Sequence, residues 1–277
     1  MATLYMVATP IGNLNDFSDR AKDTLKKCEV IFCEDTRVTD KLCNTFGIKG
    51  KKISCNHHNE AMRAKELLGI LSKGTDVAYV SDAGTPGISD PGAKLVNAAK
   101  DAGFSVSPVP GASALTAIIS VAGIESSAFK FLGFLPSKKT AREEEIKKQS
   151  EDIPWVFYEA PHRIHDTFCD IFLWLPENFK IIIGRELTKK FEQIWSGTIQ
   201  ELKDDLEKIP AKGEFVLVVI PVIKNKETPE ITDKQHILLQ ELLSKFSVKE
   251  SVRIFCDHTD LPKNKIYDLA VQIKNKK

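Results

Sequence analysis

Long apolar runs are missing from this chain of 277 residues, and none approaches the roughly 20 residues that a membrane-spanning helix needs. Charge of one sign is also missing, because 39 lysines and arginines balance 38 aspartates and glutamates to a formal net charge of +1. No overall positive field therefore indicates a nucleic-acid partner, although a local basic patch is compatible with these totals. The amino-terminal residues lack a basic segment and run into a Pro-Gly turn, so we interpret them as a first strand and not as a signal peptide.

Cysteine pairs of the CxxC type are absent, although the chain holds six cysteines. Four of these cysteines fall within the first sixty residues, near His57 and His58, but their spacings match no common structural zinc site. We therefore predict no metal site. Scattered cysteines in a long, lysine-rich chain are most simply reduced thiols, which predicts a cytoplasmic protein.

The common nucleotide-binding loops are missing as well. A GxGxxG segment does not follow the first apolar strand, which argues against a nicotinamide enzyme, and the GK[ST] of a P-loop is absent, which argues against an NTPase. The GASA segment that begins at Gly111 lacks the final glycine of a nucleophile elbow, so the sequence offers little support for a hydrolase.

Short apolar segments alternate with amphipathic segments along most of the chain. In the first half we predict strands at 4–8, 30–33, 53–55, 77–80 and 104–107, with helices at 19–27, 39–46, 60–71 and 93–102 between them. This alternation is typical of a doubly wound, mostly parallel sheet. In the second half we predict strands at 131–135, 155–158, 180–184, 193–197 and 213–220, forming a mixed sheet with helices. The predicted fold class is therefore α/β.

The length exceeds the usual size of a single domain, so more than one domain is expected. We predict an N-terminal α/β subdomain at residues 1–122, a C-terminal α/β subdomain at 123–222, and a linker with a small helical appendage at 223–277. The appendage follows a polar segment rich in lysine and glutamate and shows three short helical patterns. It could be a helix-turn-helix module or a helical cap on the sheet, and the sequence leaves both open.

Polar residues gather where the apolar strands end. The longest such segment is SDAGTPGISDPG at 81–92, whose glycines allow positive φ and close approach of a ligand and whose prolines stiffen the loop. A purely structural turn is the alternative. Similar polar segments follow other strands, at 9–13, 34–37, 57–60, 159–163 and 185–189. Because the carboxyl ends of parallel strands share one edge, we expect these segments to converge on one cleft.

Nine segments between Val7 and about Val219 form an ordered and highly specific set: VATPIGNLNDFSDRA, IFCEDTR, HHNE, VSDAGTPGISDPG, PVPGASA, FLGFLP, FYEAPHR, GRELTKKFE and KGEFVLVV. This set resembles the ribosomal RNA small-subunit methyltransferase I family of the tetrapyrrole-methylase superfamily. The resemblance implies two α/β subdomains, S-adenosylmethionine in the cleft between them, and a homodimer. It further implies methyl transfer to the ribose 2′-hydroxyl of a cytidine in the 16S rRNA of the small ribosomal subunit. The segment LPKNKIYDLA resembles the family's appendage, which would help to hold RNA.

The resemblance also implies which residues hold the cofactor, because in the superfamily the loop at 81–92 and the PGASA turn do so. The matching positions are Pro10, Asp82, Ala83, Gly84, Thr85, Ile88, Ser113 and Ala114, with Tyr158 and Gly213 on the side of the second subdomain. Backbone groups would bind the methionine end, and apolar side chains would flank the adenine. Porphyrin-modifying relatives commonly carry a GDP-type motif where this chain has Asp82-Ala83-Gly84, and this departure favours the RNA branch.

The implied reaction asks little chemistry of the protein, since a sulfonium is already an activated methyl donor. Positioning of the reacting atoms can contribute roughly 7–11 kcal/mol, and a base near the 2′-hydroxyl would help further. The candidate bases at the predicted edge are Glu34, Asp35, His57, Glu159 and Glu186. The candidate phosphate contacts are Arg37, Arg163, Arg185 and Lys189. Any of these residues could instead belong to an internal ion-pair network.

Three other hypotheses stay open at this point. The chain could methylate a tetrapyrrole or another small molecule, or it could be a non-catalytic RNA-binding assembly factor that keeps the cofactor fold as a scaffold. A metal hydrolase would use side chains from the same strand ends, namely Glu34, Asp35, His57, His58 and Asp82.

Overall fold

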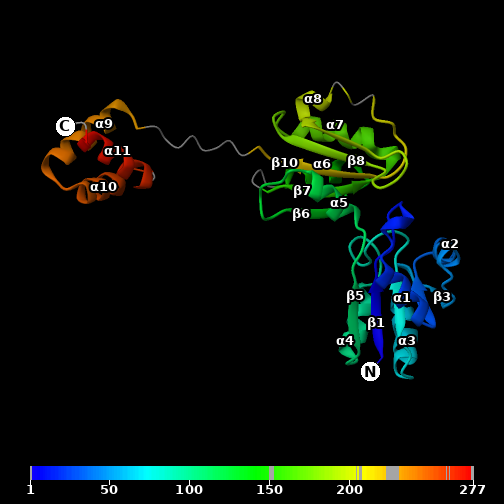
Figure 1. Cartoon of the computed structure of the whole chain (residues 1–277). Coiled ribbons are helices and arrows are strands. Elements are labelled where there is room, and N and C mark those ends of the chain that lie inside the picture. The colour runs from blue at the N-terminus through cyan, green and yellow to red at the C-terminus, as the bar shows by residue number, and fades with distance from the viewer. Residues whose placement is uncertain are drawn as a thin grey trace. The chain divides into compact units, whose positions relative to one another are not determined.

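The computed structural model describes residues 2–149, 153–203, 205, 208–222, 231–259, 261 and 263–275. The chain divides into two compact units, Met1–Val222 and Ile223–Lys277. Within the described residues, the first unit contains two five-stranded sheets with their helices, and the second contains three helices (Figure 1). The division of the first unit at residue 122 stays a prediction. None of the helices formed by the described residues has the length and apolar character that crossing a membrane requires.

The first sheet is entirely parallel, with the strand order β3-β2-β4-β1-β5. Its strands are β1 (Thr3–Val7), β2 (Val30–Cys33), β3 (Lys51–Ser54), β4 (Val77–Val80) and β5 (Ser105–Val109). Between them lie the 3-10 helix η1 (Leu14–Asp16) and the helices α1 (Asp19–Lys27), α2 (Thr36–Phe46), α3 (Glu60–Leu71) and α4 (Ala93–Asp101). Val77 and Tyr79 of β4 belong to one apolar cluster, and Ala78 and Val80 belong to another. A central strand buried on both faces is typical of a doubly wound sheet, and the predicted parallel architecture is confirmed.

Two boundaries in this half differ from the prediction. Helix α2 begins at Thr36 and not at Thr39, because the Asp35 carboxylate accepts a hydrogen bond from the Arg37 backbone N–H (2.8 Å) and caps the helix. Strand β5 continues to Val109, two residues beyond the predicted end, although it includes Pro108. Strand β5 lies at the edge of the sheet, where a proline without an N–H group can be accommodated.

The second sheet is mixed, as predicted, with the strand order β6-β7-β10-β8-β9. Its strands are β6 (Lys130–Phe134), β7 (Trp155–Glu159), β8 (Lys180–Arg185), β9 (Gln193–Thr198) and β10 (Phe215–Ile220). Strands β6 and β7 are parallel, whereas β10 is antiparallel to both β7 and β8. Consequently β7 and β8 run in the same direction and end at the same edge. The predicted strand from Gly213 begins only at Phe215.

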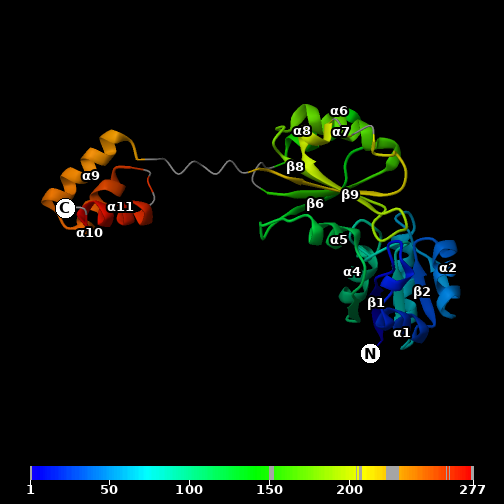
Figure 2. The same cartoon turned by 45° about the horizontal axis from the view of Figure 1, so that its top comes forward.

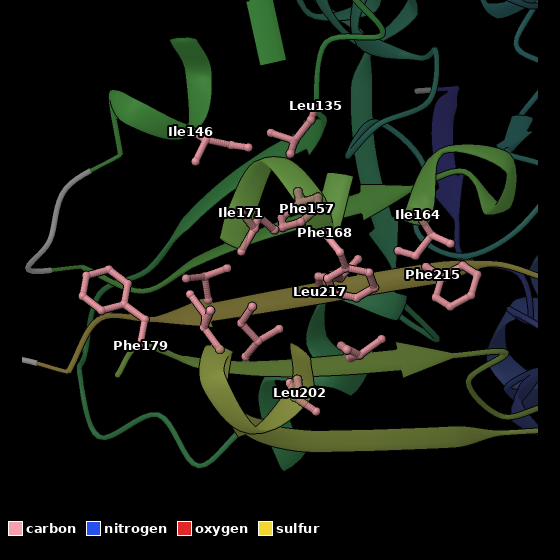
Figure 3. Packing of buried hydrophobic residues seen from close by; sticks show 14 of the residues in the cluster. Leu135, Ile146, Phe157, Ile164, Phe168, Ile171, Phe179, Leu202, Phe215 and Leu217 are labelled. Atoms are coloured by element: carbon pink, nitrogen blue, oxygen red, sulfur yellow. The ribbon is translucent and has the colours of Figure 1, made fainter. Parts of the chain in front are cut away.

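Helices cover both faces of this sheet. They are α5 (Ala114–Val121), α6 (Lys139–Lys147), the 3-10 helix η2 (Pro161–Arg163), α7 (Ile164–Trp174) and α8 (Ile199–Lys203). Figure 2 shows α6, α7 and α8 on one side of the sheet and α5 on the other. The side under α6 and α7 holds an apolar core in which Phe157 and Leu217 of the strands meet Ile146 and Phe168 of the helices (Figure 3). This core anchors β7, β8 and β10, whose ends at one edge carry functional candidates.

The second unit consists of α9 (Asp233–Lys245), α10 (Val248–Asp257) and α11 (Lys263–Asn275). Capping boxes begin α9 and α10, with Thr232 paired to Gln235 and Ser247 paired to Glu250. The three helices enclose their own small core, whose buried residues are Leu239, Val252, Phe255, Leu261, Ile266 and Ala270. The three predicted helical patterns are therefore confirmed. Most of the predicted linker, at 223–230, lies outside the described residues.

Candidate functional site: a cavity at the carboxyl edges of both sheets

A cavity of about 380 Å³ lies within the first unit. Its volume falls in the range of roughly 300–1,000 Å³ that is typical of small-molecule sites. The lining residues come from the ends of β1, β4, β6, β7 and β8, the start of β10, and the turn before α5: Ile11, Ala83, Gly84, Thr85, Ile88, Ser89, Asp90, Ser113, Ala114, Phe134, Tyr158, Glu159, Ala160, Pro161, Leu187, Glu214, Phe215 and Val216. The segment at 81–92 and the ends of β7 and β8 thus converge as expected. The segments at 34–37 and 57–60 do not line this cavity.

The loop after β4 is held rigidly on one wall of the cavity. Thr9 and Gly84 exchange two backbone hydrogen bonds (N···O 2.9 and 3.1 Å), and the Thr85 hydroxyl donates to the Ala112 carbonyl (3.0 Å). Gly84 has φ +80°, and a Cβ placed there would approach Ile11 Cγ2 to 3.2 Å. This backbone conformation favours glycine, and the hydrogen bonds to Thr9 and Ala112 hold the loop in place at the cavity.

Seven of the ten predicted cofactor residues line this cavity: Ala83, Gly84, Thr85, Ile88, Ser113, Ala114 and Tyr158. Pro10 and Asp82 instead line a second hollow of about 270 Å³ next to α2. The Asp82 carboxylate accepts a hydrogen bond from the Asp35 backbone N–H (3.0 Å), which draws it toward α2. Gly213 lines neither hollow, although it directly precedes the cavity residue Glu214.

Three of the candidate bases are engaged by neighbours. Hydrogen bonds from the guanidinium and the backbone N–H of Arg37 hold the pKa of Asp35 at about 2, which makes this carboxylate a weak base. The buried carboxylate of Glu159 accepts hydrogen bonds from Thr167 Oγ1 (2.6 Å), the Ala160 backbone N–H (2.7 Å) and Arg163 (3.1 Å). Burial alone would raise the pKa of Glu186, but hydrogen bonds from Lys189 and the Glu214 backbone N–H lower it.

Glu34 and His57 lie near the cavity without lining it. Burial raises the pKa of Glu34, and the nearby carboxylates of Asp90 and Asp82 raise it further. His57 is exposed, and its charge opposes this rise. Glu34 therefore interacts with two carboxylates of the loop after β4, Asp82 and Asp90, and of these three Asp90 lines the cavity.

The candidate phosphate contacts also have internal partners. Arg163 donates to the Leu135 carbonyl (2.6 Å) as well as to Glu159, and Arg185 donates to the Lys212 carbonyl (2.6 Å). Other partners are the Pro136 carbonyl for Arg163, Gln193 for Arg185, and Glu186 and Glu214 for Lys189. Arg37 is the most exposed, with 86% of its side-chain surface accessible, and is paired with Asp35. Their contact with RNA stays a prediction.

The six cysteines are all free thiols, and four of them are buried. Burial raises the pKa of Cys33 to about 11 and that of Cys55 to about 12, so both stay protonated at neutral pH. Among the described residues, no three histidine, cysteine, aspartate or glutamate side chains are grouped in a way that could hold a metal ion.

Several cavity residues escaped the prediction from sequence, above all Ser89, Asp90 and Phe134. Ser89 and Asp90 belong to the loop at 81–92, and Phe134 belongs to the FLGFLP segment. All three residues therefore lie in segments that the sequence had already singled out. What the sequence does not show is which side chains of these segments face the cavity.

The first unit thus has two α/β sheets and a small-molecule cavity that residues from the ends of their strands line. Residues 3–203 match the model of the family described as Tetrapyrrole (Corrin/Porphyrin) Methylases. The chain is also 42% identical to "Ribosomal RNA small subunit methyltransferase I" of Neisseria meningitidis serogroup B, over 99% of this chain and 94% of that protein. The protein of the same name from Bacillus subtilis is 39% identical over 99% of this chain and 95% of that protein. The chain therefore belongs to the tetrapyrrole methylases and, among them, to the ribosomal RNA small subunit methyltransferase I family.

Solved structures show the same fold at low sequence identity. The methyltransferase CobJ has a TM-score of 0.60 and 16% identity, covering 80% of this chain and 95% of that chain. A uroporphyrin-III C-methyltransferase of Thermus thermophilus complexed with S-adenyl homocysteine has a TM-score of 0.54 and 13% identity, covering 80% and 99%. At these identities the likeness concerns the fold alone.

Proposed function

We propose that the protein transfers a methyl group from S-adenosylmethionine to the ribose 2′-hydroxyl of a cytidine in the 16S rRNA of the small ribosomal subunit. The observation that carries this proposal is the preformed cavity at the carboxyl edges of both sheets, in a chain 38–42% identical to several ribosomal RNA small subunit methyltransferases I over nearly its full length. We also infer a cytoplasmic protein, because that is where ribosomal subunits are made and used.

The residues of the cavity suit S-adenosylmethionine. A Cβ at Gly84 would press on Ile11 in the cavity wall, and Ile11 and Ile88 offer apolar surface to an adenine ring. Ser113 and Ala114 stand at the amino end of α5, where the helix dipole favours a carboxylate. When bound, the cofactor supplies an activated methyl group on a sulfonium. The protein's task is then to hold donor and acceptor in line and to exclude water.

The partners in this proposal are the small ribosomal subunit and a second copy of the chain, since the family resemblance implies a homodimer. The second unit would help to hold RNA. On the first unit, Arg37 would contact the RNA phosphates, because its guanidinium is the most exposed of the four candidate contacts.

The test is methyl transfer from labelled S-adenosylmethionine to small subunits, to naked 16S rRNA and to a porphyrin precursor. We expect label in the RNA, recovered as 2′-O-methylcytidine after nuclease digestion. Label in the porphyrin precursor alone would establish the small-molecule hypothesis. RNA binding with neither methyl transfer nor calorimetric binding of S-adenosylmethionine would establish the assembly-factor hypothesis.

A further inference from the structure

The cavity contains a second set of groups suited to the methyl acceptor. We propose that Phe134, Ser89 and Asp90 form an acceptor subsite for the target nucleoside, in which Phe134 stacks on the base and Asp90 accepts the proton of the 2′-hydroxyl. This inference rests on the proposed function and assigns residues for the acceptor half of the same site.

Phe134 presents an aromatic ring at the cavity. It ends β6, lines the cavity and is 57% exposed, which is unusual for a large apolar side chain at such a place. Its ring meets Tyr158 edge-on, with 5.6 Å between centroids, so one neighbour orients the ring while most of its surface stays open. The register of β6 against β7 shifts between Phe131 and Phe134, and such irregularities re-aim side chains. An oriented, exposed ring is the platform on which proteins stack unpaired RNA bases.

Ser89 contributes a hydroxyl that lacks a partner among the described residues. Its Oγ is buried and makes no hydrogen bond there, although a hydroxyl can both donate and accept. This Oγ lies 3.8 Å from where a Cβ on Gly133 would stand, which places it beside the strand that carries Phe134. A buried polar group without a partner requires an explanation, and a ligand hydroxyl at this position supplies one.

Asp90 contributes the proton acceptor. It follows Ser89 directly and lines the cavity, and its carboxylate lies within hydrogen-bonding reach of the Ser81 hydroxyl. Unlike Asp35, Glu159 and Glu186, it has no lysine or arginine partner among the described residues. The titratable groups around it are Glu34, His57, Tyr79, Asp82 and Tyr158.

The surroundings of Asp90 strengthen its carboxylate as a base. Burial raises the pKa of Asp90, and the negative charge of Asp82 raises it further, whereas the hydrogen bond from Ser81 and the nearby His57 oppose the rise without reversing it. A carboxylate with a raised pKa holds an accepted proton more firmly than an exposed one does. Asp90 thus differs from Asp35, whose lowered pKa makes it a weaker acceptor.

The transfer step balances with these groups. The 2′-oxygen forms a bond to the methyl carbon while the bond between that carbon and sulfur breaks, and the electron pair of the broken bond stays on sulfur. The hydroxyl proton moves to the Asp90 carboxylate. A cationic sulfonium and an anionic carboxylate thereby become a neutral thioether and a neutral carboxylic acid.

Phe134 is tested on the full chain with Phe134→Ala, Phe134→Tyr and the control Phe129→Ala, which removes an exposed ring outside the cavity. Base stacking on an aromatic ring is worth roughly 1–3 kcal/mol, so Phe134→Ala should raise the KM for RNA about tenfold or more. Calorimetric affinity for S-adenosylmethionine should stay unchanged, and Phe134→Tyr should restore the KM. Weakened cofactor affinity in Phe134→Ala would instead assign the ring to the adenine and overturn the stacking role, as would an unchanged KM.

Asp90 is tested with Asp90→Asn, Asp90→Glu and the control Asp101→Asn, an exposed aspartate at the end of α4. Loss of a general base should lower kcat by roughly 10²–10⁴-fold with S-adenosylmethionine affinity retained. The acidic limb of the wild-type pH profile should disappear in Asp90→Asn and return, shifted, in Asp90→Glu. A kcat within threefold of wild type, or a loss of cofactor binding with kcat maintained at saturation, would overturn the assignment.

Ser89→Ala completes the set and should raise the KM for RNA without changing cofactor affinity. Thermal unfolding of each variant separates a folding defect from a site defect. The conservative variants serve the same purpose, since Phe134→Tyr keeps the aromatic ring and Asp90→Glu keeps the charge. If the wild-type protein transfers methyl groups to RNA while all these variants do so equally well, the subsite fails and the proposed function stands. If the wild-type protein transfers none, the proposed function itself fails.

Discussion

Glu159 is the last residue of β7 and is 2% exposed. Hydrogen-bond donors surround its carboxylate. Replacing it with alanine would leave the Arg163 guanidinium without its charge partner, and breaking such a buried pair costs about 3–5 kcal/mol. We expect Glu159→Ala to lose stability of that order in urea unfolding. The control Glu144→Ala, on the exposed side of α6, should change it by less than about 0.5 kcal/mol. A Glu159→Ala protein that unfolds like wild type but fails to transfer methyl groups would show that Glu159 acts in the chemistry.

Gly84 and Gly87 offer a matched pair of substitutions, because both have φ near +80°. A Cβ on Gly84 would lie 3.2 Å from Ile11 Cγ2 in the cavity wall, whereas a Cβ on Gly87 would meet no atom within 4 Å. Both Gly84→Val and Gly87→Val should lower stability by roughly 1–3 kcal/mol through backbone strain. Only Gly84→Val should abolish calorimetric binding of S-adenosylmethionine while the fold survives. Retained affinity in Gly84→Val would mean that the loop at 81–92 is a structural turn.

Glycine and the acidic residues illustrate what could be predicted from sequence at the scale of single residues. The loop at 81–92 was singled out because small residues at a strand end suggest a ligand wall, the family resemblance pointed to Gly84 within it, and Gly84 lines the cavity. Asp35 and Glu159 were candidate bases for the same kind of reason, yet each accepts several hydrogen bonds from neighbours. Position along a strand is visible in a sequence, whereas the partners of a carboxylate depend on which donors the fold brings to it.

At the scale of elements, the turn after β8 holds two residues in an uncommon backbone conformation at the cavity rim. Glu186 and Thr188 have φ of +52° and +67°, which is uncommon for residues with a Cβ. The Lys189 ammonium bridges the carboxylates of Glu186 and Glu214, at 2.9 Å from each. Leu187, which lies between Glu186 and Lys189 in the chain, lines the cavity, and so does Glu214. The bridge therefore offsets backbone strain and holds two lining residues in place.

This bridge predicts a pH-dependent contribution to stability. Hydrogen bonds from Lys189 and the Glu214 backbone N–H lower the pKa of Glu186 against the opposing effect of burial. Its contribution is thus present above the unfolded-chain pKa of about 4.3 and is lost as the pH falls through the lower pKa of the folded state. Hydrogen bonds to Glu214 and Glu186 raise the pKa of Lys189, although burial alone would lower it, so its contribution is lost as the pH rises through that raised value.

Lys189→Met keeps the apolar stem and removes the charge. We expect its Tm to lie below that of wild type between about pH 5 and 10, and the difference to shrink toward pH 3. Lys190→Met, which removes the exposed neighbouring charge, should show no such pH-dependent difference. A difference between wild type and Lys189→Met that is constant from pH 3 to pH 8 would rule out the bridge as its source.

At the scale of the whole molecule, the two units have separate cores. The apolar clusters of the first unit close within Met1–Val222, and every residue that lines the cavity lies there. The second unit has a cluster of its own. A protein ending at Val222 should therefore fold and bind S-adenosylmethionine with unchanged affinity. It should bind 16S rRNA more weakly, because the second unit is proposed to help hold RNA, and gel-shift titration of both proteins measures this. Equal RNA affinity would remove the second unit from the proposal.

The sequence by itself determined the alternation of strands and helices, the polar segments at the strand ends and the family resemblance, because periodicity and turn residues are local properties of the chain. The tertiary structure decided which polar side chains are engaged and which face the cavity. Asp82 and Asp90 lie in one loop, but a hydrogen bond from Asp35 draws the first toward α2 while the second lines the cavity. Asp90 and Phe134 meet at one cavity from different sheets, and only packing brings such distant segments together. Burial and hydrogen-bond partners set the chemistry of a carboxylate, and both arise only when the chain has folded.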